Sequence, residues 1–269
     1  MKVAVFGDVH GALPAMYEAV QAWEKARGQT IDYVLQAGDM GVYPDLNRID
    51  SATRVYARED PSELFARLYV EGKLEASHKT FFVRGNHEDQ EFLRKVGTGS
   101  IDPAGKIVHI AGAFPVVIGG REKGFSVVTL GGVEPPHLED PLSGWSNGGS
   151  RKYFDQGEVR KILKFPSEKI DILLTHDGPR GYCLKNDPIA GSAILLEVIK
   201  RLQPRFHFFG HYNHCPPEST IGRTRVVPLN IVGAYTLPKR DGGMGILDTS
   251  SWSFEFVKGR DLEPSEIAA

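Results

Sequence analysis

The chain has 269 residues, 41% of them hydrophobic, and a formal net charge of −2 at pH 7; this length allows one α/β domain with a sizeable core, and the charge lacks the basic excess of many nucleic-acid binders. The two cysteines, Cys183 and Cys215, form no close pair, which disfavours a disulfide framework and favours a reducing compartment. The N-terminus shows no signal peptide and no apolar run reaches about eighteen residues, so we expect a cytoplasmic protein without a membrane span.

The first half of the chain alternates predicted strands with predicted helices. Strands are expected at Lys2–Phe6, Ile31–Gln36 and Lys79–Arg84, and helices at Pro14–Arg27 and Pro61–Glu71. Gly28 and Gly72 follow the two helices, where glycine commonly ends a helix. Residues 41–60 are polar and are expected to form an irregular insertion. Helices between strands predict βαβ units with mostly parallel pairing.

The second half begins with closely spaced strands, which predict antiparallel pairing. They are expected at Ile107–Ile110, Phe114–Ile118 and Phe125–Leu130, and residues 131–154 follow as a long loop. Further on, helices are expected at Asp155–Lys164 and Ser192–Leu202, and strands at Ile170–Leu174, Arg205–Phe209, Thr224–Asn230, Met244–Asp248 and Trp252–Lys258. The polar residues 260–269 are expected to be a frayed tail. Together these elements predict one α/β domain over residues 1–269, with two mixed β-sheets packed as a sandwich flanked by helices.

Five short polar motifs follow predicted strands. They are Asp8-Val9-His10, Gly38-Asp39, Gly85-Asn86-His87-Glu88, Thr175-His176-Asp177 and Gly210-His211-Tyr212-Asn213-His214. Functional sites in open α/β sheets form at the carboxyl ends of strands. Each motif alone is common by chance, but five in this order indicate a site for divalent ions such as Mn²⁺, Fe or Zn²⁺. A pair of such ions is typical of enzymes that hydrolyse phosphate esters.

The residue types suggest how the ions are shared. Asp8 and His10 are two residues apart, so on an extended chain they point the same way and can share one ion. The two carboxylate oxygens of Asp39 can bridge two ions. Asn86 offers a neutral carbonyl oxygen, while its neighbour His87 points elsewhere and is free for substrate. His176 and His211 can supply imidazoles to the second ion.

With these motifs, the chain from Asp8 to His214 resembles the calcineurin-like metallophosphoesterase superfamily, whose members are helix-flanked β-sandwiches with two divalent metals. The resemblance implies a first metal held by Asp8, His10 and Asp39, and a second held by Asp39, Asn86, His176 and His211. It also implies that His87 stabilises the transition state or protonates the leaving oxygen. A water bridging the metals would then be the nucleophile.

Two positions depart from the family pattern. Val42 stands where a second aspartate usually follows Asp39, a residue that mainly orients the motif. The last motif is normally G-H-x-H, but here the matching position is Asn213 and a histidine, His214, follows it. Strand alternation favours Asn213 as the last metal ligand, whereas ligand strength favours His214.

A second resemblance concerns the substrate. The stretch His176-Asp177-Gly178-Pro179-Arg180-Gly181 looks like the H-D-x-P-R-G stretch of RNA lariat debranching enzymes, which cleave a phosphodiester. Those enzymes carry a cysteine where Val9 stands here. The match implies a phosphate contact for Arg180, because a guanidinium fits phosphate geometry. Arg84, which directly precedes the motif Gly85-Asn86-His87-Glu88, is either another phosphate contact or a surface residue at a strand end.

We therefore predict a metal-dependent phosphoester hydrolase, with a phosphodiesterase or nuclease acting on nucleic acid or a nucleotide as the leading interpretation. The first alternative is a phosphomonoesterase such as a protein phosphatase, which needs additional phosphate-binding arginines; Arg84 and Arg180 are the candidates. The second alternative is a protein-interaction scaffold built on a metal-binding fold, which predicts loss of metal ligands or of His87. The sequence does not indicate an oligomeric state.

Overall fold

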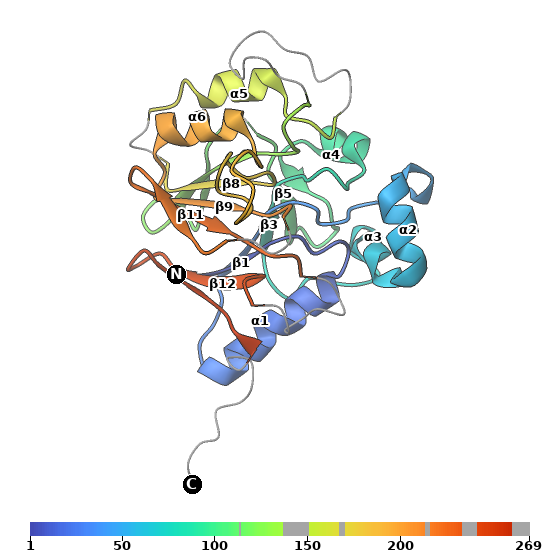
Figure 1. The fold of residues 1–269 in the computed structure, drawn as a ribbon. Coiled ribbons are helices and arrows are strands. Elements are labelled where there is room, and N and C mark those ends of the chain that lie inside the picture. The colour runs from blue at the N-terminus through green and yellow to red at the C-terminus, as the bar shows by residue number, and fades with distance from the viewer. Residues whose placement is uncertain (113, 137–150, 167–169, 213–215, 233–240, 260–269) are drawn as a thin grey trace.

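The computed structural model describes residues 1–112, 114–136, 151–166, 170–212, 216–232 and 241–259. Two β-sheets pack face to face, with helix α1 (Leu13–Arg27) outside one sheet and helices α5 (Gln156–Ile162) and α6 (Ala193–Leu202) outside the other (Figure 1). This arrangement confirms the predicted sandwich of two mixed sheets. Residues 137–150 of the predicted long loop and the predicted tail 260–269 lie outside the described residues.

The first sheet has strand order β13-β12-β1-β2-β3-β5-β4 among the described residues. Its strands are β1 (Lys2–Phe6), β2 (Tyr33–Gln36), β3 (Thr80–Phe82), β4 (Gly99–Ser100), β5 (Ile107–His109), β12 (Met244–Asp248) and β13 (Ser253–Phe256). The central strands β1, β2, β3 and β5 run parallel, and β4, β12 and β13 add antiparallel pairs at the two edges. The carboxyl ends of the central strands therefore meet at one edge of the sheet.

The second sheet has strand order β10-β11-β9-β8-β7-β6 in the described part of the chain. Its strands are β6 (Val116–Ile118), β7 (Phe125–Leu130), β8 (Ile172–Thr175), β9 (Phe206–Phe209), β10 (Ser219–Ile221) and β11 (Thr224–Pro228). Strands β7, β8, β9 and β11 run parallel, whereas β6 and β10 are antiparallel edge strands.

One predicted pairing is wrong. The β6–β7 hairpin is antiparallel as expected, but β5 lies in the other sheet, parallel to β3. The reason is helix α4 (Gln90–Val96), which the sequence reading missed and which lies on the path from β3 to β4 and β5. Asp89 caps this helix by accepting from the Phe92 N–H, and the helix buries Leu93, so one carboxylate and one apolar contact hold it.

The alternation of side chains along β1 and β2 explains the layers. Val3, Val5 and Leu35 face the second sheet, where they pack with residues of β8 such as Ile172 and Leu174. The intervening residues, including Ala4, Phe6 and Val34, pack against α1. Because both faces of these strands are buried, they appear in the sequence as short unbroken apolar runs. That burial holds the strand ends in place.

The segment between β2 and β3 differs from its prediction. Residues 41–60 were expected to be irregular, but they include the 3₁₀ turn η1 (Leu46–Arg48) and helix α2 (Ser51–Glu59). The predicted helix Pro61–Glu71 is divided into η2 (Pro61–Leu64) and α3 (Ala66–Val70). Asp50 caps α2 and Asp60 caps η2, so side-chain hydrogen bonds to backbone N–H groups specify where these two elements begin. Within the described residues, no helix is long and apolar enough to cross a membrane.

Candidate metal centre

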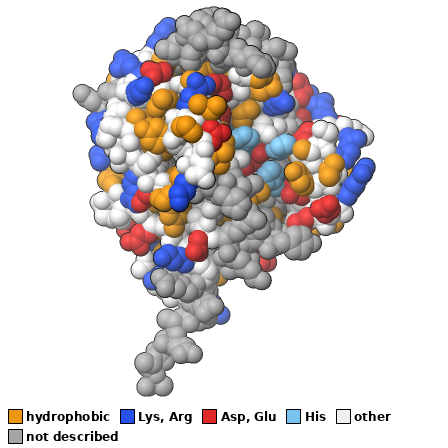
Figure 2. Space-filling model, viewed as in Figure 1, with side chains coloured by type: hydrophobic (Ala, Val, Ile, Leu, Met, Phe, Trp, Pro, Cys, Tyr) orange, Lys and Arg blue, Asp and Glu red, His pale blue; other side chains and the backbone are white. Residues whose placement is uncertain are grey.

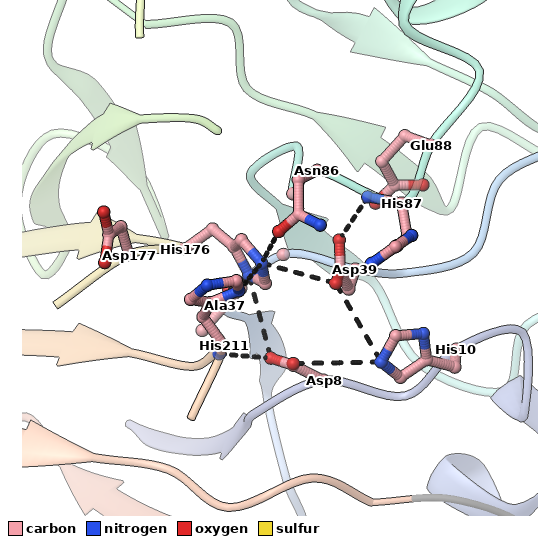
Figure 3. Close-up of polar contacts among 12 residues, drawn as sticks. Asp8, His10, Ala37, Asp39, Asn86, His87, Glu88, His176, Asp177 and His211 are labelled. Atoms are coloured by element: carbon pink, nitrogen blue, oxygen red, sulfur yellow. Dashed lines mark hydrogen bonds and ion pairs between the residues drawn. The ribbon is translucent and has the colours of Figure 1, made fainter. Parts of the chain in front are cut away.

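The five motifs converge at the carboxyl ends of five parallel strands. Asp8, Asp39 and Asn86 follow β1, β2 and β3 of the first sheet, and His176 and His211 follow β8 and β9 of the second (Figure 3). Histidine side chains gather with acidic ones in one hollow of the surface, beside the part formed by α2 and α3 (Figure 2). Parallel pairing within each sheet, and packing of the two sheets, place the motifs together.

Two groups of ligand atoms lie close enough to hold metal ions. Within each group, the atoms are within 4.8 Å of one another. The first group is Asp8, His10 and Asp39, with His10 Nε2 3.9 Å from a carboxylate oxygen of each aspartate. The second is Asp39, His176 and His211. Asp39 belongs to both groups, which is the position of a bridging ligand.

The second group has its lone pairs directed inward. The Nδ1–H of His176 donates to the Ala37 carbonyl at 3.1 Å, which leaves the lone pair on Nε2. Around that Nε2 lie Asn86 Oδ1 at 2.9 Å, His211 Nδ1 at 3.2 Å and Asp39 Oδ2 at 3.3 Å. Oxygen and nitrogen acceptors at such distances repel one another unless a proton or cation lies between them. This donor set fits a divalent transition-metal ion.

The electrostatics of the cluster also favour a cation. Burial lowers the pKa of His176, but the carboxylates of Asp39 and Asp8 outweigh it and raise that pKa to about 10. Burial raises the pKa of Asp39, yet His176 and His10 hold it well below its usual range. Burial and the charge of His176 lower the pKa of His211 to about 3. The site therefore attracts positive charge into a buried position, a demand that a metal ion meets.

Three of the candidate ligands have an unusual backbone. His10, Asp39 and His211 have φ angles of 41°, 52° and 69°, in the left-handed region that non-glycine residues rarely adopt. Each such residue costs about 1 kcal/mol or more, and such strain tends to collect at functional sites. The surrounding strands and hydrogen bonds hold these residues in place, which indicates that the fold favours ligand geometry over local backbone preference.

Two motif glycines leave room for the carboxylates. A Cβ on Gly85 would lie 2.0 Å from Asp39 Oδ1, and one on Gly210 would lie 2.1 Å from Asp8 Oδ1. The backbone beside each carboxylate then binds it: His87 N–H donates to Asp39 Oδ1 at 2.7 Å, and His211 N–H donates to Asp8 Oδ1 at 2.9 Å. Glycine is required at both positions because backbone and ligand approach so closely.

His87 has a carboxylate partner that the sequence reading missed. Its Nδ1 lies 2.9 Å from Asp50 Oδ2, and Asp50 also caps α2 through the N–H groups of Ala52 and Thr53. Burial lowers the pKa of His87, but the Asp50 hydrogen bond and the Asp39 charge outweigh it and raise that pKa. The sequence signal that could have found Asp50 is Asp50-Ser51-Ala52-Thr53, a helix N-cap inside the segment predicted to be irregular.

Glu88 connects the third motif to the second. Its carboxylate accepts the N–H groups of Met40 at 2.8 Å and Val42 at 2.7 Å, just beyond Asp39. Burial raises the pKa of Glu88 to about 8, with the Asp39 charge adding to the effect. Val42, which replaces the second aspartate of the family pattern, is buried in the core. Glu88 therefore orients the backbone next to the shared ligand.

Glu63 of η2 is a second acidic residue that the sequence reading missed. Its Oε2 lies 3.7 Å from His10 Nδ1, on the opposite side of the ring from Asp8 and Asp39. Among the described residues this buried oxygen has no hydrogen-bond partner. Burial raises the pKa of Glu63 to about 7, although His10 opposes the shift. The position is that of a carboxylate orienting a metal-binding histidine.

The two predicted substrate arginines differ in their contacts. Arg84 donates to the carbonyl oxygens of Arg151 and Tyr153 at 2.7 and 3.1 Å, and neither of these residues belongs to the two ligand groups. Arg180 is half exposed, forms an ion pair with Glu134 at 3.2 Å, and lines a cavity that His211 also lines. Asn213 and His214 lie outside the described residues, so the identity of the last ligand stays a prediction.

Comparison with known proteins identifies the family of this arrangement. The family model described as calcineurin-like phosphoesterase matches residues 1–215. A lariat debranching enzyme of Drosophila melanogaster is 29% identical over 240 residues, which is 80% of this chain and 43% of that enzyme. The lariat debranching enzyme of Entamoeba histolytica is 27% identical over 258 residues, 86% of this chain and 69% of that enzyme. The chain thus spans less than half of the first relative and about two thirds of the second.

Solved structures share the fold at low sequence identity. The protein TT1561 of Thermus thermophilus has a TM-score of 0.58 and 15% identity, with 96% of this chain and 99% of that chain covered. GAP50, described as the anchor in the inner membrane complex of Plasmodium, has a TM-score of 0.53 and 13% identity, with 98% and 86% covered. These likenesses concern the fold alone.

Proposed function

The chain belongs to the calcineurin-like phosphoesterase family, and on that premise we propose that it is a dinuclear metal-dependent phosphodiesterase acting on nucleic acid. The observation that carries the proposal is the pair of ligand groups that share Asp39. Asp8, His10 and Asp39 would hold one divalent ion, and Asp39, Asn86, His176 and His211 the other. Bound divalent ions supply a water of lowered pKa as nucleophile and neutralise charge on the phosphate.

The protein groups have separate roles in this reaction. Asp39 keeps the two ligand groups together, and the Ala37 carbonyl fixes the tautomer of His176. His87 is the proton donor to the leaving oxygen. Its Nδ1 is occupied by Asp50, so Nε2 is the atom left for the substrate. Burial lowers the pKa of His87, but the Asp50 hydrogen bond and the Asp39 charge outweigh it and raise that pKa, which favours the protonated ring that a proton donor needs.

The surroundings of the cluster support a diester over a monoester. A monoester site needs several arginines for the free phosphate oxygens, and Arg84 is engaged by two backbone carbonyls. Next to His211, a cavity of about 400 Å³ is lined by Asp177, Arg180 and Tyr212 among others. That cavity offers space for the part of a substrate beyond the scissile phosphate, and Arg180 offers a contact for a second phosphate.

The relatives and the motif at His176–Gly181 support RNA as the substrate, because the similar proteins are described as lariat debranching enzymes. The protein-scaffold alternative predicts lost ligands, and Asp8, His10, Asp39, Asn86, His87, His176 and His211 are all in place. The cysteine content favours the cytoplasm as the proposed location.

The test compares bis-p-nitrophenyl phosphate with p-nitrophenyl phosphate, first in EDTA and then with Mn²⁺, Fe²⁺ or Zn²⁺ restored. We expect metal-dependent cleavage that prefers the diester and falls about 10²- to 10⁴-fold in His87→Ala. His78→Ala serves as the matched control, since that histidine contacts Glu24 and Ser77 instead of the cluster. Preference for the monoester would favour the phosphatase alternative, and metal binding without turnover of either ester or of branched and linear RNA would favour the scaffold.

A further inference from the structure

The three candidate metal-binding histidines differ in what holds their rings. His10 Nδ1 lies 3.7 Å from a carboxylate oxygen of Glu63. The Nδ1–H of His176 donates to the Ala37 carbonyl at 3.1 Å. His211 presents Nδ1 to His176 Nε2 at 3.2 Å, and in the described part of the chain its own Nε2 has no carbonyl or carboxylate partner. Metal-binding histidines nearly always have such a partner, so the orientation of His211 needs another explanation.

An aromatic ring contacts the imidazole of His211 instead. The ring of Tyr212 meets it edge-on, with the ring centroids 4.9 Å apart and the planes at 83°. Aromatic pairs favour this geometry. Phe209, which is fully buried in the core, meets the Tyr212 ring edge-on as well, with centroids 6.4 Å apart and planes at 80°. Tyr212 therefore connects a core residue to a candidate metal ligand.

A tight turn brings these two neighbouring residues together. The Tyr212 N–H donates to the Gly210 carbonyl at 2.9 Å, and His211 between them has a φ angle of 69°. A hydrogen bond from residue i+2 to residue i across a positive φ is typical of the rare, strained kind of γ-turn. On an extended strand, neighbouring side chains would point to opposite faces. The strained turn thus allows the ring of Tyr212 to touch the imidazole beside it.

The hydroxyl of Tyr212 is anchored away from the ring contact. It donates to Asp177 Oδ1 at 2.7 Å, and Asp177 is 3% exposed. The same carboxylate accepts the N–H groups of Gly178 at 2.8 Å and of Glu134 at 2.9 Å, so the backbone fixes its position. It belongs to neither ligand group and lies to one side of the cluster (Figure 3). Asp177 is therefore a fixed support for Tyr212, whose hydroxyl also hydrogen-bonds Cys183.

We propose that Tyr212 is a positioning residue for the second metal: its ring, anchored through Asp177, holds the imidazole of His211 in the orientation that binds the ion. The inference rests on the proposed two-metal site. A ligand that is oriented before the ion arrives loses less side-chain freedom on binding it, so the site binds its ion more tightly. Because the ring contact is with His211, the effect is confined to the ligand group to which His211 belongs.

The test is calorimetric titration of the metal-free full chain with Mn²⁺ alone, which needs no substrate. We expect two ions per chain, and His211→Ala identifies the site that depends on this histidine. At that site, Tyr212→Leu should weaken Mn²⁺ binding about tenfold or more, as the loss of an orienting partner does, and the other site should keep its affinity. Tyr212→Phe keeps the ring but loses the hydrogen bond to Asp177, so its affinity should lie between those of wild type and Tyr212→Leu.

Tyr182→Leu is the matched control, since Tyr182 packs against the same core cluster and, among the described residues, has no ring contact with a histidine. It should lower the free energy of unfolding, measured with urea, as Tyr212→Leu does, but leave both Mn²⁺ affinities unchanged. Equal weakening of the two sites in Tyr212→Leu, or an equal loss of Mn²⁺ affinity in Tyr182→Leu, would overturn the positioning role.

The two Tyr212 variants separate the parts of the proposal. Wild-type affinity in Tyr212→Leu would overturn the role of the ring, and wild-type affinity in Tyr212→Phe would overturn the anchoring by Asp177. Either result would leave the proposed phosphodiesterase standing. In contrast, a wild-type chain that binds no second Mn²⁺ would overturn the two-metal site and the role of Tyr212 with it.

Discussion

The strand ends and the segment between Asp45 and Leu64 both contribute to the candidate active site, but different forces hold them. The strands β1 and β2 are buried on both faces, and the ligands that follow them are positioned by sheet packing. In contrast, helix α2 is mostly exposed: of its nine residues, all of which the structure describes, only Thr53 is buried. That segment is held by aspartate caps and supplies Asp50 and Glu63, the carboxylates beside His87 and His10. The candidate metal ligands are thus placed by apolar packing, whereas the carboxylates beside His10 and His87 depend on polar contacts.

The largest effect is expected at the shared ligand. Asp39→Asn removes a negative charge from both ligand groups. We expect this variant to lose several kcal/mol of transition-state stabilisation, which corresponds to a fall in kcat/KM of about 10³-fold or more. Steady-state kinetics on the diester and metal content by mass spectrometry measure it. Retention of both metals with activity within tenfold of wild type would contradict the bridging role.

Asp50→Asn tests the orienting segment. We expect activity about 10- to 100-fold lower with metal content unchanged, because Asp50 contacts His87 and no candidate ligand atom. The hydrogen bond to Asp50 raises the pKa of His87, so its loss lowers that pKa. Since the protonated ring is the donor in the proposed reaction, the alkaline limb of the pH–rate profile should move to lower pH. An unmoved limb, in a variant with native circular dichroism, would remove Asp50 from the proton-transfer step.

Glu63→Gln should have a smaller effect, confined to the first ligand group. The carboxylate lies 3.7 Å from His10 Nδ1, and loss of such an orienting partner weakens metal affinity about tenfold. Titration with Mn²⁺ should show one weakened site and one unchanged site. Weakening of both sites alike would indicate a general structural effect instead of orientation of His10.

The smallest effect is expected on the surface of α2. Tyr56 is 55% exposed, so Tyr56→Ala should change the free energy of unfolding by about 0.5 kcal/mol or less. Leu35→Ala at a fully buried position of β2 should cost about 2–5 kcal/mol. Urea denaturation of the two variants measures the difference. A Tyr56 effect as large as that of Leu35 would show that α2 is packed as firmly as the sheets.

Much of the site could be anticipated from local sequence. Each ligand motif follows an apolar run, and the rule that sites form at the carboxyl ends of parallel strands needs no further information. Asp50 and Glu63 could not be found in this way, because their significance comes from contacts with residues 37 and 53 positions away in the chain. The pairing of β5 was predicted wrongly for the same reason. Its short apolar run is compatible with either sheet, and only the path of the chain through α4 places it beside β3.

The sequence by itself determined the layered α/β fold, the family and the chemistry of the candidate ligands, since burial patterns and residue types are local properties. The tertiary structure decided which atoms share a site: the two groups meeting at Asp39 and the Asp50–His87 hydrogen bond. Those arrangements depend on packing between segments far apart in the chain. The left-handed backbones of His10, Asp39 and His211 illustrate the reason, because local preference opposes them and only the surrounding structure holds them.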